Sequence, residues 1–234
     1  MNLHRVSSVV LSAVAALSLA ASAQAAIVVT NPGFEAQVLA DGVDSWPAGP
    51  TGWLVLGSGI SGEVCYKNPL LTDSPQAVNS NFGYAYASNA NSALTLYQEV
   101  DTAFVANTTY TLRVLVGDID ATARPFPDTV RLGIYNGTAN SGGVLTDVLP
   151  GGITNITTTP GDGQAAYYTV NYTTGAVAPT GPVVIGMSVF NTTQDGALAL
   201  ATFDDVTVTV PEPATLGVLV GAASLLGLRR RRGQ

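Results

Sequence analysis

The feature that most constrains the fold is a succession of short strand-like runs separated by turn residues. Between residues 26 and 210, runs such as AIVVT, TYTLRVLVG and PVVIGMSVF alternate with turn clusters such as NPGFE and TTPGDG. No part of this stretch keeps a helical period over three turns. About ten or eleven strands at this spacing predict an all-β domain, an antiparallel two-sheet β-sandwich of the jelly-roll kind.

Alternation within a run predicts which side chains share a sheet face, because successive strand residues point to opposite sides. In FDDVTVTV, residues 203–210, this rule places Asp204 on the side of Val206. It places Asp205 on the opposite side, together with Phe203. A carboxylate on either side of such a strand needs a partner, and a metal ion is one candidate.

The two ends of the chain differ from the middle. Residues 1–25 have a short polar start, an apolar stretch and an Ala-Gln-Ala cleavage site, which together predict a signal peptide. Residues 214–228 form an uncharged run, and a helix of that length spans only roughly 22 Å against roughly 30 Å of hydrocarbon core. Four arginines, 229–232, follow it. The sequence thus predicts a signal peptide over 1–25, a sandwich domain over 26–210 and a tail over 211–234.

Charge and histidine content exclude several functions for the domain 26–210. It keeps 4 of the 9 basic residues and 15 of the 16 acidic ones, so its net charge is 4 − 15 = −11. Such a charge argues against nucleic acid or anionic lipid as a partner. The one histidine, His4, lies in the predicted signal peptide, so Ser-His-Asp and Cys-His catalysis are excluded in the mature domain.

The tail carries a specific motif. Pro211, Glu212 and Pro213, then an apolar helix and the cluster Arg229, Arg230, Arg231 and Arg232, resemble the PEP-CTERM sorting signal. The resemblance implies that exosortase, a membrane protease-transpeptidase of Gram-negative bacteria that make exopolysaccharide, processes the tail. It also implies transient insertion in the inner membrane through residues 214–228, followed by release to the cell surface or extracellular matrix.

The body carries a second resemblance. NPGFE, GW, LYQEVDTAFVANTTYTLRVLVGD and FDDVTV look like elements of galactose-binding-like jelly rolls, which include carbohydrate-binding modules. The resemblance implies a structural calcium ion held by Glu35 and Asp205, with Asp204 as the alternative. Calcium prefers six to eight oxygen ligands, which carboxylates and turn carbonyls can supply. The alternative reading is that these carboxylates are solvated or accept backbone N–H groups.

Sugar binding requires exposed aromatic faces on which pyranose rings stack. Trp46 is the best candidate, because DSWPAGPTG reads as a loop in which a large ring is hard to bury. Tyr167 and Tyr168 are adjacent and must point to opposite faces, so at least one can be exposed. Trp53, at a strand start, is assigned to the core.

Two further motifs give little information about function. GSGISG, residues 57–62, fits the dinucleotide-binding glycine pattern but is followed by a strand-like run and not by a helix. Asp118 and Asp120 in GDID could form a carboxylate pair for glycoside cleavage or a second cation site. Residues two apart at a strand end are more often solvated or metal-bound.

These observations together predict an exported, non-enzymatic surface or matrix protein associated with exopolysaccharide. Direct carbohydrate binding and a purely structural or adhesive role without a sugar site both stay open. A glycan-active enzyme is the least favoured alternative.

Overall fold

The computed structural model describes residues 24–37, 39–40, 43, 45, 49–57, 59–65, 81–87, 92–101, 103–118, 125–161, 163–192 and 199–211. The chain divides into two compact units, of which Ala26–Val210 is one. The described part contains no helix long and apolar enough to cross a membrane. The predicted signal peptide before residue 24 and the predicted helix 214–228 lie outside the described residues.

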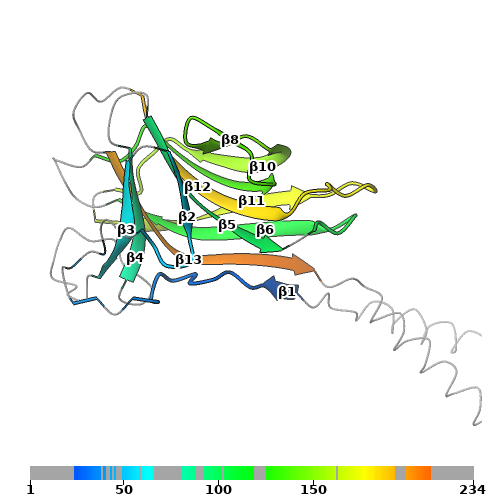
Figure 1. Ribbon diagram of the computed structural model, residues 1–234, viewed down its shortest axis with the longest axis horizontal. Helices are drawn as coiled ribbons and strands as arrows, with labels where there is room; N and C mark the ends of the chain where they lie inside the picture. The colour runs from blue at the N-terminus through cyan, green and yellow to red at the C-terminus, as the bar shows by residue number, and fades with distance from the viewer. Residues whose placement is uncertain are drawn as a thin grey trace, which may run out of the picture. The chain divides into compact units, whose positions relative to one another are not determined.

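Two antiparallel sheets make up the domain, and Figure 1 shows how their strands are arranged. The first sheet has the order β11-β6-β13-β4-β3, with β1 paired to β13. Its strands are β1 (Gln24–Ile27), β3 (Gly59–Cys65), β4 (Asn81–Ala87), β6 (Thr109–Gly117), β11 (Ala165–Thr173) and β13 (Ala199–Pro211).

The second sheet has the order β10-β7-β12-β5-β2, and a small ladder joins β8 to β9. Its strands and that ladder are β2 (Leu54–Gly57), β5 (Ser92–Asp101), β7 (Thr129–Asn136), β8 (Asn140–Ser141), β9 (Val144–Leu145), β10 (Val148–Ile156) and β12 (Val183–Asn191). The predicted antiparallel two-sheet β-sandwich is confirmed.

The core lies between the sheets. On β6 every second residue faces inward, from Tyr110 to Val116, as alternation predicts. The second sheet supplies β-branched and aliphatic side chains such as Val130 and Ile185, which are at most 1% exposed. Burial of this apolar area is the main source of folding free energy.

The last strand departs from simple alternation. Asp204 lies opposite Leu115 and Thr207 opposite Arg113, so β13 uses one more residue than β6 over this stretch. The extra residue makes a β-bulge, and Asp205 adopts a left-handed backbone conformation with φ 45°. Because of the bulge Phe203 and Val206 both face the core. The prediction that Asp204 shares a face with Val206, and Asp205 with Phe203, is therefore wrong.

The NPGFE turn is packed against the start of β4 and the bulge of β13. The ring of Phe34 stacks on Trp53 with centroids 5.4 Å apart, which places Trp53 in the core as expected. The ring also fills the space above Gly83, where an added Cβ would meet Phe34 Cε1 at 2.4 Å. Val206 N–H donates to the carbonyl of Pro32 at 2.9 Å, so the turn and the last strand are joined directly.

Candidate functional site

The outer face of the first sheet, turned away from the core, carries a group of aromatic side chains around one acid. Core residues such as Ala85 and Phe203 alternate with them along β4 and β13. The register places Tyr84 opposite Thr202, Tyr86 opposite Leu200 and Asp204 opposite Leu115, and directly opposed residues share a face. We call this surface the aromatic face, and its residues are Phe82, Tyr84, Tyr86, Leu115, Leu200, Thr202 and Asp204.

The aromatic face is shielded from solvent although it lies outside the intersheet core. Tyr84 and Tyr86 are 3% and 7% exposed, and their rings meet edge to face with centroids 5.2 Å apart. Ser45 Oγ comes within 3.1 Å of the position that a Cβ on Gly62 would take, beside the hydroxyl of Tyr84. The face therefore offers a dry, largely apolar surface with a few hydroxyl groups.

Asp204 is the acidic residue of this face, and only 2% of its surface is exposed. A buried carboxyl group is costly unless it is hydrogen-bonded. Its Oδ1 accepts the backbone N–H of Asp205 at 2.7 Å. The bulge thus points the N–H of Asp205 at the carboxyl group of Asp204. The same bulge keeps that carboxyl group on the apolar aromatic face.

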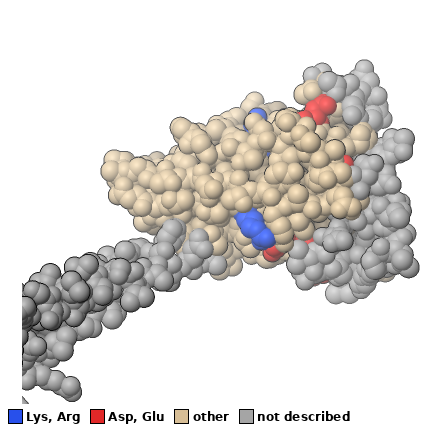
Figure 2. Space-filling view, turned by 180° about the vertical axis from the view of Figure 1, so that it is seen from behind, with Lys and Arg blue, Asp and Glu red and all other residues tan. Residues whose placement is uncertain are grey.

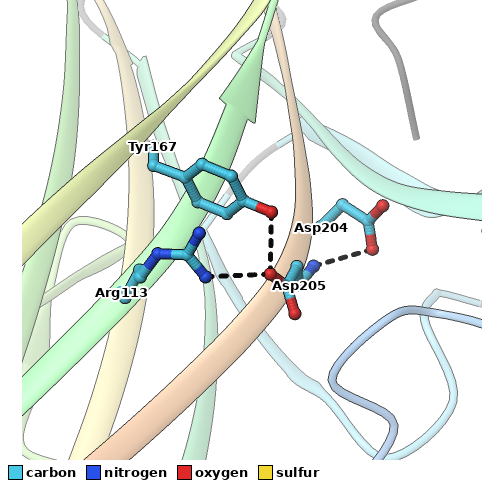
Figure 3. Close-up of polar contacts among 4 residues, drawn as sticks. All are labelled: Arg113, Tyr167, Asp204 and Asp205. Carbon is cyan, nitrogen blue, oxygen red and sulfur yellow. Dashed lines mark hydrogen bonds and ion pairs between the residues drawn. The ribbon is translucent and has the colours of Figure 1, made fainter. Parts of the chain in front are cut away.

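Beside Asp204 lies a cluster of Arg113, Tyr167 and Asp205, drawn in Figure 3. Arg113 Nη1 and the hydroxyl of Tyr167 both donate to Asp205 Oδ2, at 3.0 and 2.8 Å. The guanidinium also stacks on the tyrosine, with Cζ 3.3 Å from the ring centroid. Donation to the Asp205 carboxylate is the main cause that raises the pKa of Tyr167 above its ordinary value; partial desolvation adds to it.

The raised pKa of Tyr167 predicts that this residue's contribution to folding stability changes with pH in the alkaline range. The neutral phenol is favoured in the folded state, so its contribution to stability is complete below the ordinary tyrosine pKa of about 10 and is lost as the pH rises through the higher folded pKa. Tyr167→Phe should therefore lower the free energy of unfolding at neutral pH and lose that deficit at strongly alkaline pH. Denaturant unfolding of both proteins across this range measures it; a constant difference would contradict the prediction.

Of the predicted sugar-stacking residues, the structure describes Tyr167 and Tyr168. Trp46 lies outside the described residues. Tyr168 is half-buried and packs against the core. Tyr167 is exposed, as adjacency on a strand predicts for one of the pair, but Arg113 covers one side of its ring.

The predicted calcium ligands are engaged with protein groups. Glu35 Oε1 accepts the N–H of Asn81 at 2.6 Å, and Asp205 is bound by Arg113 and Tyr167. In the described ranges no group of three or more His, Cys, Asp or Glu side chains could hold a metal ion. The NPGFE turn lies beside β13, and the calcium site implied by the resemblance, with Glu35, Asp204 and Asp205 as ligands, stays a prediction.

Asp118 of the GDID motif is a buried acid at a strand end. It follows β6 directly, is 3% exposed, and its carboxylate accepts the hydroxyl of Thr159. Asp120 lies outside the described residues. The contact with Thr159 gives Asp118 a role in joining the end of β6 to the segment before β11.

The fold and this surface define a class: a β-sandwich that presents a buried acid within an enclosed aromatic sheet face. The chain belongs to the HpiC1-like family, described as HpiC1 cyclase, which matches residues 25–209. No curated protein matches the chain significantly.

Solved structures with the same fold include two cyclases from Fischerella sp. TAU. The Stig cyclase Fisc, in complex with (3Z)-3-(1-methyl-2-pyrrolidinylidene)-3H-indole, has 18% identity and a TM-score of 0.64, over 82% of this chain and 100% of that one. A cyclase in complex with 4-(1H-indol-3-yl)butan-2-one has 19% identity and a TM-score of 0.65, over 81% and 99%.

Family membership corrects the function predicted from the sequence. The chain belongs to a family of cyclases, which are enzymes, so the prediction of a non-enzymatic, exopolysaccharide-associated surface protein is wrong. Recognition of the chain as a PEP-CTERM protein with a carbohydrate-binding-module body is likewise wrong, because the matching family is a cyclase family. Of the proposed signal only Pro211, the end of β13, is described; Glu212, Pro213 and the four arginines lie beyond it.

The sequence analysis did not single out the aromatic face, although its signal was present. In FGYAYA, residues 82–87, aromatic rings alternate strictly with small residues. That pattern places all the rings on one side of a strand and lets the other side pack closely against the core.

Proposed function

We propose that this protein is a cyclase that closes a ring in an apolar, aromatic small molecule by proton transfer from Asp204. The observation that carries the proposal is the position of Asp204: a buried carboxyl group opposite Leu115, on the same enclosed sheet face as Tyr84 and Tyr86. Membership of the HpiC1-like family supports a cyclisation as the reaction class.

The chemistry needs an acid and a dry surface rich in π-electrons. The carboxyl group of Asp204 adds its proton to one carbon of a substrate alkene, which leaves a carbocation on the other carbon. An electron-rich ring carbon of the same molecule then forms a C–C bond to that cation, and the ring loses a proton to the carboxylate. The product is an isomer of the substrate, and no oxidant or reductant is consumed.

The aromatic rings have a defined part in this scheme. The face of a tyrosine or phenylalanine ring attracts a cation, and the attraction is larger where water is excluded. Phe82, Tyr84 and Tyr86 would stabilise the carbocation as it forms and shield it from water, which would otherwise add to it. A sugar-binding surface would instead keep its rings exposed.

The substrate class follows from the same surface and from the neighbours. Figure 2 shows few charged side chains on the described surface that it displays. The aromatic face itself holds Asp204 among otherwise uncharged side chains, which suits an uncharged ligand. The two Fischerella structures hold indole compounds. An indole with an alkene on a short chain at C3 combines an electron-rich ring and a protonatable double bond, so we take 3-alkenylindoles as the substrate class.

The test is turnover of such a 3-alkenylindole in D₂O. The expected product is a ring-closed isomer that carries one deuterium from solvent at the former alkene carbon, detected by mass spectrometry and NMR. Binding of 4-(1H-indol-3-yl)butan-2-one, measured by calorimetry, tests the substrate class separately. Absence of both binding and isomerisation would overturn the proposal.

Export, predicted from residues 1–25, is part of the proposal. The cyclase would then act outside the cytoplasm. Fractionation of the producing cells with an antibody against the sandwich domain tests it, and recovery of the protein in the cytoplasmic fraction alone would contradict it.

A further inference from the structure

The bulge in β13 places two consecutive acids in different surroundings. Asp204 is buried on the aromatic face, whereas the side chain of Asp205 is 30% exposed. Asp205 has φ 45°, a conformation that residues other than glycine adopt at an energetic cost and retain only where neighbouring groups hold it. The groups that hold Asp205 can be named from the contacts of its side chain.

Arg113 and Tyr167 hold the Asp205 side chain from two neighbouring strands. Both donate to the same oxygen, Oδ2, and the guanidinium carbon of Arg113 lies over the tyrosine ring (Figure 3). β11 and β6 pair in continuous register, so Tyr167 and Arg113 are held in place by the sheet itself. The carboxylate of Asp205 is therefore fixed at a defined point on the sheet surface.

Fixing that side chain also fixes the main chain of the same residue. The N–H of Asp205 points at Asp204 Oδ1, 2.7 Å away. Rotation of the Asp205 backbone toward an ordinary strand conformation would turn this N–H away from the carboxyl group. A chain of contacts thus runs from Arg113 through Asp205 to Asp204.

We propose that Arg113 is a positioning residue for the catalytic acid: by holding Asp205 in the bulge it orients the Asp204 carboxyl group on the aromatic face. This inference rests on the proposed function, because that function gives Asp204 its role as proton donor. Arg113 itself does not touch the substrate in this scheme.

A purely structural role for the Arg113–Asp205 pair predicts a different outcome. The two side chains are 41% and 30% exposed, and ion pairs so accessible to water contribute little to stability. If the pair only supported the fold, its loss would change melting slightly and catalysis not at all. The chain offers a matched control in Arg131 of the second sheet, which bonds Asn155 Oδ1 at 3.1 Å and lies 4.7 Å from the Phe190 ring centroid.

The first test follows the hydrogen bond from the Asp205 amide to the Asp204 carboxyl group and needs no enzyme turnover. In wild-type protein the amide proton of Asp205 should resonate downfield in ¹H–¹⁵N NMR, because its hydrogen bond to a carboxyl oxygen is short. Asp204→Ala, which removes the acceptor, identifies that signature. Arg113→Ala should shift the resonance upfield, and Arg113→Lys should restore part of the shift, while Arg131→Ala leaves it in place. An unchanged Asp205 amide in Arg113→Ala would overturn the inference.

The second test measures the consequence for catalysis. With a 3-alkenylindole, Arg113→Ala should lower kcat on the order of tenfold to a hundredfold through misplacement of the acid, with KM nearly unchanged. Arg113→Lys should recover part of kcat, and Arg131→Ala should retain wild-type kcat. A wild-type kcat in Arg113→Ala would overturn the inference while the proposed function stands. A wild-type kcat in Asp204→Asn would instead overturn the proposed function.

Discussion

Replacement of Asp204 by asparagine is expected to lower the rate of ring closure by roughly 10²–10⁴-fold, the range that a positioned acid contributes. Asparagine has nearly the same shape, and its carbonyl oxygen can still accept the N–H of Asp205, so the bulge is retained. Its amide cannot supply the proton that starts the reaction. The measurement is the initial rate of isomer formation from a 3-alkenylindole, followed by chromatography with mass detection.

The control for Asp204→Asn is Asp118→Asn. Asp118 is as deeply buried and also accepts a hydrogen bond, from Thr159, but it lies at the end of β6, where the sheet pairing stops. Its loss should lower stability and leave the rate constant of the folded enzyme intact. Calorimetric binding of 4-(1H-indol-3-yl)butan-2-one should persist in both variants. If both variants lose turnover to the same extent, a general loss of buried acids, not proton donation by Asp204, is the cause.

Replacement of Phe34 by alanine is expected to lower the free energy of unfolding by about 3–5 kcal/mol, the cost of truncating a fully buried phenylalanine. Phe34 is 0% exposed, stacks on Trp53 and lies directly over Gly83. For a domain of this size the melting temperature should fall by roughly 10 °C. Differential scanning calorimetry of the purified domain measures it.

Phe190→Ala provides the comparison for Phe34→Ala. Phe190 is half-buried on β12 and has Arg131 over its ring. Its truncation should cost about 1 kcal/mol, because less apolar surface is returned to water. Equal losses for the two variants would show that the NPGFE turn is not a main anchor of the fold.

The sandwich could be predicted from sequence because alternation and turn residues act locally. The run 109–117 coincides with β6, and the aromatic run at 82–87 falls within β4. VLTDVL, residues 144–149, has the pattern of one strand, but the structure divides it between β9 and β10. Local sequence patterns predict the positions of strands more reliably than the points at which a strand is interrupted.

The site was harder to predict because it depends on one irregularity. Nothing in FDDVTV shows which residue will leave the regular period, and strict alternation gave the wrong faces for Asp204 and Asp205. The partners Arg113 and Tyr167 are 92 and 38 residues away from Asp205 in the chain. Their convergence follows from the order β11-β6-β13, which requires long-range pairing that a single sequence does not display.

Because β13 is synthesised after the strands that it joins, its place in the sheet affects how the protein folds during synthesis. β13 lies between β6 and β4, yet of the described strands it is synthesised last. Until residues 199–211 have emerged, β6 and β4 lack their common partner, and neither the aromatic face nor the intersheet core can close. Long-range pairing of this kind forms late and slowly. We therefore expect the first sheet to be completed only after residues 199–211 have been synthesised.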